Sequence, residues 1–286
     1  MQEYAASPGV MVYEQRRGMS SDPERDKCFE NKQKKYGYVT DLAKKIAQKD
    51  SGYPYVADYG GTNLTGDSAK EWNSNSIIIW VGHGDYDEDI GPCLITSQVR
   101  TDDNFQRFAN DFKAGRIIGQ RGDYYALTWK FFDYYYKNNS LKGSLIWLAP
   151  CYSIRDSRLA DTLLAKGAST VIGNKNPAYI PRIIYLTNEF FNTLMSTDLD
   201  TGATYTAGKA LAKANDKLKA NKVGDLVAPV VAVIGENTPG SVNEVILKGD
   251  ANWSLGGGAT VTGMVGDENG HPIKGAVVSI EGTNHT

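Results

Sequence analysis

The sequence predicts an α/β fold of three layers, in which helices cover both faces of a mostly parallel central sheet. Two unbroken apolar runs, at residues 76–81 and 144–148, are typical of central strands in such a sheet, because half-exposed strands alternate apolar and polar residues. Predicted strands and helices also alternate along most of the chain. With 286 residues, of which 41% are hydrophobic, the chain is long enough to bury a large core.

The elements around the first apolar run fit this fold class. Short strands are predicted at residues 9–13 and 53–57. Between them, apolar residues recur at the i, i+3, i+4 and i+7 spacing of one helix face, namely Val39, Leu42, Ala43 and Ile46. After the run comes a long segment with two predicted helices, near 103–114 and 124–137, which is a candidate for substrate-binding loops.

Downstream of the second apolar run, strands and helices continue to alternate. The predicted elements are a helix that ends at Gly167, a strand at 169–173, helices near 181–195 and 204–220, and a buried strand at 228–234. This order supports a single large α/β domain.

The composition changes near residue 250, where a glycine-rich stretch precedes a tail with a β-hairpin pattern. Two or three strands cannot bury a core by themselves, so the tail is predicted to be the opening part of a truncated β-sandwich. We therefore expect a domain at residues 1–248, a linker at 249–258 and the start of a β-sandwich at 259–286.

Charge and composition exclude several partners and leave the compartment open. A net charge of −2 gives no electrostatic footprint for nucleic acid, and no apolar run is long enough to span a membrane. The amino terminus does not resemble a signal peptide, so the chain is either intracellular or begins after a removed leader. Of three cysteines, Cys28 and Cys93 could form a disulfide that leaves Cys151 as a thiol, or all three could be thiols.

Chemistry-bearing residues follow both apolar runs directly. The first run leads into Gly82, His83 and Gly84, and the second leads into Pro150 and Cys151. If the two strands are parallel neighbours, His83 and Cys151 emerge at the same edge of the sheet, where ligands of such folds bind.

A cysteine and a histidine at this edge form a candidate nucleophile and base. The N–H groups of Gly84 and Cys151 could stabilise an oxyanion, and a helix from about residue 155 would place its positive end near the thiol. The alternative is that Cys151 is a small buried side chain and His83 is structural. Residues 1–250 contain one histidine, so no zinc site and no cofactor are expected; the acidic run at 85–89 is a solvated loop or, as a weaker alternative, a calcium site.

The order of these motifs resembles that of the caspase-fold (clan CD) cysteine peptidases, with gingipain-like peptidases and CHAT domains as the closer branches. The resemblance covers roughly residues 70–248 and rests on His83-Gly84, on Ala149-Pro150-Cys151-Tyr152-Ser153 and on the strand at 169–173. It implies a caspase-like fold, His83 as the base, Cys151 as the nucleophile, the Gly84 and Cys151 amides as the oxyanion hole, and a protein or peptide substrate. The tail resembles a carboxypeptidase regulatory-like domain, which implies a secreted or surface protein.

The resemblance also carries an implication for substrate preference. The resemblance leads us to expect a basic residue on the amino side of the cut bond, although several relatives with that preference carry an acidic residue where this chain has Ala149-Pro150. Asp85 and Asp156 are the carboxylates nearest the strand ends and are the candidates for binding it, unless they are solvated surface charges. Two other functions use the same fold or residues: a non-catalytic interaction domain and a small-molecule acyl hydrolase.

Overall fold

The computed structural model describes residues 9–14, 31, 33–35, 37–49, 55–60, 63–72, 77–120, 123–178, 180–221 and 245–255. The chain divides into two compact units, residues 1–256 and residues 257–286. The second unit, which contains the whole of the predicted β-sandwich segment, lies outside the described residues, as does the strand predicted at 228–234.

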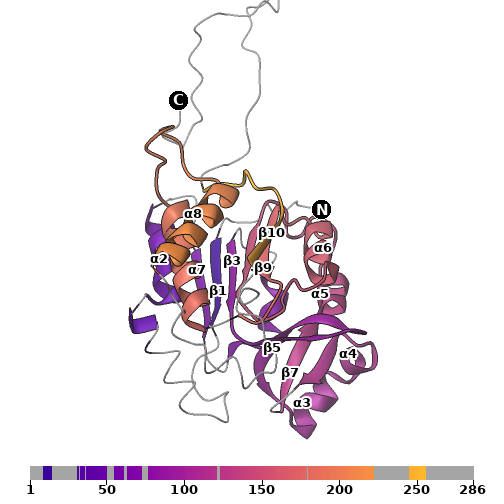
Figure 1. Cartoon of the computed structure of the whole chain (residues 1–286). Coiled ribbons are helices and arrows are strands. Elements are labelled where there is room, and N and C mark those ends of the chain that lie inside the picture. The colour runs from indigo at the N-terminus through magenta and orange to yellow at the C-terminus, as the bar shows by residue number, and fades with distance from the viewer. Residues whose placement is uncertain are drawn as a thin grey trace, which may run out of the picture. The chain divides into compact units, whose positions relative to one another are not determined.

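The described residues of the first unit form a six-stranded, mostly parallel sheet, which confirms the predicted fold class (Figure 1). The order across the sheet is β10 (Val245–Gly249), β9 (Thr170–Asn174), β8 (Leu145–Leu148), β3 (Ile77–Val81), β1 (Gly9–Glu14) and β2 (Tyr55–Gly60). Neighbouring strands are parallel except β10, which runs antiparallel to β9. The strand at β10 was not predicted.

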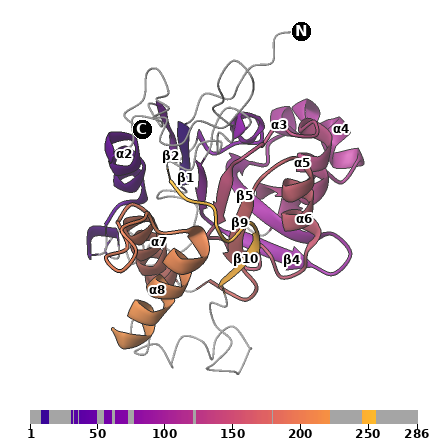
Figure 2. The same cartoon turned by 90° about the horizontal axis from the view of Figure 1, so that it is seen from above.

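Helices cover both faces of this sheet. One layer contains α2 (Val39–Lys49), α7 (Ile180–Leu194) and α8 (Ala207–Ala220), and the other contains α5 (Trp129–Tyr135) and α6 (Arg158–Ala165) (Figures 1 and 2). Ile77 and Ile79 belong to the core beneath the first layer, whereas Ile78 and Trp80 belong to the core beneath the second. Successive side chains of a strand point to opposite faces, so a strand covered on both faces requires an unbroken apolar run.

The structure contains a second sheet that was not predicted from the sequence. It is antiparallel, in the order β4 (Gly84–Asp87), β5 (Gly91–Val99), β7 (Tyr124–Thr128) and β6 (Ile117–Gln120). The helix predicted at 103–114 is two short helices, α3 (Asp102–Arg107) and α4 (Ala109–Lys113), and the helix predicted at 124–137 is β7 followed by α5. The prediction of a helix at 124–128 was wrong because β7 pairs with strands on both sides, and this tertiary pairing overrides local propensity.

The end of the first unit also differs from the expected linker. Gly249 belongs to β10, and Asp250 donates its N–H to the carbonyl of Ser169 at 2.8 Å. The indole of Trp253 donates to the carbonyl of Gly143 at 2.8 Å, and Leu255 is buried. Residues as far as Leu255 therefore pack on the α/β unit, although the flexible composition begins earlier.

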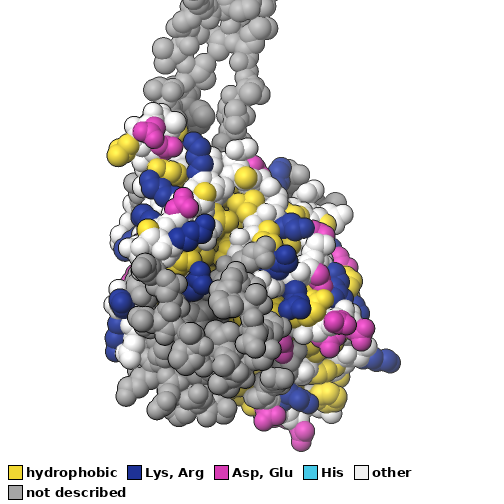
Figure 3. All heavy atoms as spheres, viewed as in Figure 1, with side chains coloured by type: hydrophobic (Ala, Val, Ile, Leu, Met, Phe, Trp, Pro, Cys, Tyr) yellow, Lys and Arg dark blue, Asp and Glu magenta, His cyan; other side chains and the backbone are white. Residues whose placement is uncertain are grey.

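The described surface carries charged side chains of both signs (Figure 3). On the described part of the face in Figure 3, basic and acidic side chains are interspersed. Among the described residues, no helix has both the length and the apolar character needed to cross a membrane.

Candidate active site

The two apolar strands that lead to His83 and Cys151 are parallel neighbours, as predicted. In the register of β3 and β8, Trp80 lies opposite Leu148, so His83 and Cys151 each follow this pair by the same number of residues. The N–H of Ala149 donates to the carbonyl of Trp80 at 2.9 Å and extends the pairing beyond the strand end. Both residues consequently leave the sheet at the same carboxyl edge.

Gly84 brings the two segments into direct contact. A Cβ atom on Gly84 would lie 2.6 Å from the carbonyl oxygen of Cys151 and 2.6 Å from the Cβ of Pro150. The main chain after His83 therefore packs against the main chain of Cys151 with no room for a side chain, which only glycine allows. The carbonyl of His83 accepts the N–H of Ile95 at 3.0 Å, which ties this segment to β5.

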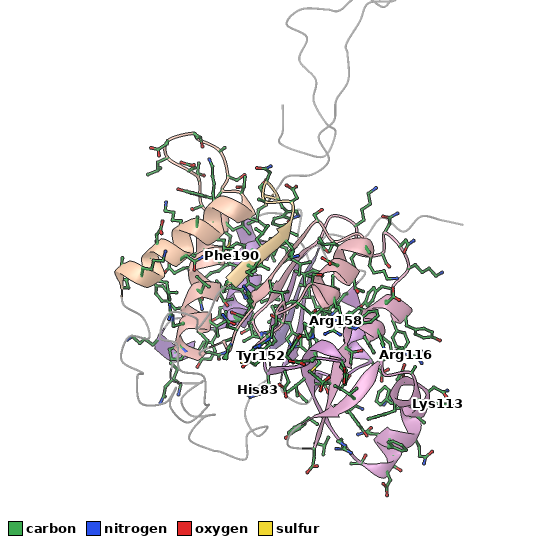
Figure 4. The ribbon with its side chains drawn as sticks, turned by 45° about the vertical axis from the view of Figure 1, so that its right-hand side comes forward. His83, Lys113, Arg116, Tyr152, Arg158 and Phe190 are labelled. Carbon is green, nitrogen blue, oxygen red and sulfur yellow. The ribbon has the colours of Figure 1, made fainter. Side chains whose placement is uncertain are left out.

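The side chains of the pair differ in exposure. His83 is exposed and Cys151 is half-buried. Figure 4 shows His83 and Tyr152, the residue after Cys151, at the same end of the central strands. Neither side chain is fully buried, so both can be reached from the solvent.

The sulfur of Cys151 is held by the segment that follows β9. It accepts the N–H of Ala178 at 3.2 Å, and the thiol faces the carbonyl of Ala178 at 3.8 Å. An N–H directed at sulfur favours negative charge on that atom. Tyr152 has a φ of 57°, in the left-handed region that few residues with side chains adopt, and donates its N–H to Asn176 at 3.3 Å. The turn at Cys151 is thus both strained and fixed.

Two buried polar residues at this turn were not predicted. Ser153 and Asn174 are both fully buried, and each forms hydrogen bonds within the Cys151 loop. Asn174 is the last residue of β9, a third parallel strand with its carboxyl end at the same edge. The rule that ligand sites lie beyond the carboxyl ends of parallel strands could have singled it out.

Asp156 already has a cationic partner in this chain. Its carboxylate accepts hydrogen bonds from Arg158, at 2.9 Å from the main-chain N–H, 2.9 Å from Nε and 2.6 Å from Nη2. The pKa of Arg158 is raised above its ordinary value, chiefly because of the hydrogen bond to Asp156. Arg158 also donates to the carbonyls of Glu88 and Asp89 at 2.9 and 2.8 Å, so the pair fastens the β4–β5 turn to α6.

The helix after Cys151 begins later than expected. α6 starts at Arg158, whereas the sequence predicted a start near residue 155. Residues 151–157 form turns and bends, and the Asp156 carboxylate accepts the N–H of Arg158, the first helical residue. The N-cap residue Ser157 makes no side-chain cap bond, and Asp156 instead satisfies one of the first-turn N–H groups that have no partner within the helix.

The remaining acidic residues of the predicted loop form the β4–β5 hairpin. The half-buried Asp85 accepts the N–H of Tyr86 at 2.8 Å, and Asp87 accepts the N–H groups of Asp89 and Ile90 at 2.9 and 3.0 Å. Within the described part of the chain, no three His, Cys, Asp or Glu side chains gather as ligands for a metal ion. These carboxylates therefore stabilise the turn through the main chain.

An arginine in the Cys151 loop lies over two aromatic rings. The guanidinium of Arg155 is 4.9 Å from the ring centre of Tyr86 and 5.1 Å from that of Tyr152. The two rings are 6.5 Å apart. Stacking of this kind connects β4 to the Cys151 loop and gives the site an exposed cation.

Of the two other cysteines, Cys93 is among the described residues and Cys28 is not. Cys93 is a buried thiol on β5, and its sulfur faces the carbonyl of Asp85 at 3.4 Å. Cys28 lies outside the described residues, and with it the predicted alternative of a Cys28–Cys93 disulfide.

Comparisons with known proteins found no matching family model and no similar curated protein. The solved structures that align with the chain include the following two. The crystal structure of the Arg-specific cysteine proteinase gingipain R aligns with 11% identity and a TM-score of 0.46, over 87% of this chain and 48% of that one. The complex of the pro- and mature domains of RgpB from Porphyromonas gingivalis aligns with 10% identity and a TM-score of 0.42, over the same shares. This chain spans about half the length of the solved structures it matches.

Proposed function

We propose that this chain is a cysteine endopeptidase in which His83 and Cys151 form a catalytic dyad. The observation that supports it most is the contact between the two strand ends, where Gly84 lies against the carbonyl of Cys151 with no space for a Cβ atom. Close packing of this kind holds a base and a nucleophile together on rigid strands rather than on long loops.

The proposed reaction follows from the chemistry of the two side chains. His83 removes the proton of the Cys151 thiol, and the thiolate attacks the carbonyl carbon of the peptide bond. The Gly84 and Cys151 N–H groups stabilise the negative oxygen of the tetrahedral intermediate. The imidazolium then protonates the leaving amine, which leaves a thioester on Cys151. Water that loses its proton to His83 attacks the thioester, which releases the carboxylic acid and restores the thiol.

Turnover of a peptide library and of simple esters tests this function against its alternatives. We expect the wild-type chain to cleave peptides, and His83→Ala and Cys151→Ala each to abolish cleavage while thermal melting shows a folded protein. Cys93→Ala, which removes a buried thiol on β5, should retain cleavage. Turnover of esters without peptides would indicate an acyl hydrolase. A folded chain that cleaves neither substrate would contradict an enzymatic function and favour an interaction domain.

A further inference from the structure

The side chain of Asn174 binds the main chain immediately before the proposed nucleophile. Its Nδ2 donates to the carbonyl of Ala149 at 2.7 Å and lies 3.3 Å from the carbonyl of Pro150. These are the two carbonyls that precede Cys151, and Asn174 is fully buried. The amide group therefore sets the direction in which the chain enters the turn.

The main chain of Asn174 binds the same loop after the nucleophile. Its N–H donates to Oγ of Ser153 at 3.0 Å, and its carbonyl accepts the N–H of Ile154 at 3.0 Å. The Ser153 hydroxyl in turn donates to the carbonyl of Leu148, the last residue of β8, at 3.0 Å. A Cβ atom on Gly173 would lie 2.7 Å from Oγ of Ser153, so the strand is fitted closely to this hydroxyl.

The orientation of the Asn174 amide is fixed, although it leaves one polar atom unsatisfied. Oδ1 of Asn174 is buried with no hydrogen-bond partner among the described residues. Rotating the amide would direct Oδ1 at carbonyl oxygens, which cannot donate, so the observed orientation is the one that forms bonds. A buried acceptor without a partner costs free energy that an apolar side chain of the same size would avoid. Stability alone therefore does not explain an asparagine at this position.

We propose that Asn174 is a positioning residue that aims Cys151 at the substrate, with Ser153 as its partner in the loop. The proposal rests on the proposed function of Cys151 as the nucleophile. Asn174 bonds to the chain on both sides of Cys151, so the end of β9 sets the position of the thiol relative to His83. It acts through the loop and does not contact the reacting atoms.

The test compares two probes of Cys151 in the variant Asn174→Leu. A peptidyl acyloxymethyl ketone requires a thiol aligned with a bound peptide, whereas iodoacetamide requires only an accessible thiolate. We expect the ratio of the ketone rate to the iodoacetamide rate to fall about tenfold to 100-fold, because small misplacements of a reacting group cost rates of this size. The matched control is Asn188→Leu, a buried asparagine on α7 whose Nδ2 donates to Gly37 at 3.1 Å, which should keep the wild-type ratio.

A second variant keeps the test decisive if Asn174→Leu fails to fold. Ser153→Ala removes the hydroxyl that joins β8 to Asn174, and its ratio should fall in the same direction by a smaller factor. An unchanged ratio in whichever variants fold would overturn the positioning role. Equal loss of both rates would also overturn it, because a merely loosened loop affects both probes. A wild-type Cys151 that reacts with neither probe faster than Cys93 would instead refute the proposed function itself.

Discussion

Polar side chains are buried both at the carboxyl edge of the central sheet and beside the antiparallel sheet. The two groups differ in the partners of their hydrogen bonds and ion pairs. At the edge, Asn174 and Ser153 bond to the loop that carries Cys151. Next to the antiparallel sheet, buried Asp111 pairs with Arg116 and accepts the hydroxyl of Tyr135 at 2.9 Å. The first group holds the loop of the proposed nucleophile, whereas the second holds its own helices and strands together. Changes in the first region should alter reactivity, and changes in the second should alter stability.

The largest effect on reactivity is expected from Gly84→Ala. The new methyl group would lie 2.6 Å from the Cys151 carbonyl, so the two strand ends must separate. We expect labelling of Cys151 by the ketone probe to slow at least about 100-fold. Gly66→Ala is the control, because its methyl would lie at ordinary contact, 3.5 Å from Ile117 and 3.6 Å from Phe108. Wild-type labelling of Gly84→Ala would contradict the close packing of the site.

The largest effect on stability is expected from Asp111→Ala. It leaves the mostly buried Arg116 without its carboxylate, which costs about 3 kcal/mol of unfolding free energy. Urea denaturation measures this loss, and the labelling rate of Cys151 in the folded variant should not change. Asp41→Ala, which breaks an exposed pair with Lys44, should cost less than about 0.5 kcal/mol. A large change in Cys151 reactivity in Asp111→Ala would break the distinction between the two regions.

The same contrast explains how much could be predicted from the sequence. Strands buried on both faces by helices require unbroken apolar runs, so β3 and β8, with the residues at their ends, could be predicted. β5 is buried along nearly all its length, yet it contains Thr96, Ser97 and Gln98 and no clean alternation. Thr96 is satisfied by the carbonyl of Tyr125 at 2.9 Å, a partner distant in the sequence. Such pairings depend on tertiary contacts and leave no local pattern.

The hydrogen-bond partners of individual site residues could not be predicted from the sequence for the same reason. No local sequence pattern indicates that Asn174 donates a hydrogen bond to the Ala149 carbonyl, because the two residues meet only when β8 and β9 pair. The pairing of Asp156 with Arg158 spans one intervening residue, but its link to Glu88 and Asp89 requires the folded hairpin. Residue types at strand ends could be predicted, whereas their bonds could not.

A smaller effect concerns substrate choice. Asp156 is paired with Arg158, so we expect Asp85→Asn to weaken a preference for basic residues more than Asp156→Asn does. Fluorogenic substrates that differ only in Arg, Lys, Asp or Leu before the cut bond measure this preference. Asp156→Asn should also lower the free energy of unfolding by at most about 1 kcal/mol, because the ion pair of Asp156 with Arg158 is partly exposed. A wild-type preference for Asp or Leu would remove the basic pocket altogether.

A further expected effect is a loss of stability at alkaline pH. Burial, followed by the hydrogen bond to Asp111, raises the pKa of Tyr135 to about 12. The unfolded value is about 10, so the fold favours the neutral phenol, and this contribution is complete below about pH 10 and is lost as the pH rises through about 12. The difference in unfolding free energy between the wild type and Tyr135→Phe should shrink over this range. A difference independent of pH would contradict the assignment.

The dyad itself is tested most directly by the rates at which the ketone probe labels each cysteine, with and without His83. Cys93 is buried, so slow labelling of Cys93 alone would not prove that Cys151 is activated. The decisive comparison is between the wild type and His83→Ala. If His83 activates Cys151, the wild-type thiol reacts far faster than Cys28 and Cys93, and His83→Ala removes that difference while the fold persists. Equal labelling of all three cysteines, or fast labelling of Cys151 that survives the loss of His83, would contradict the dyad.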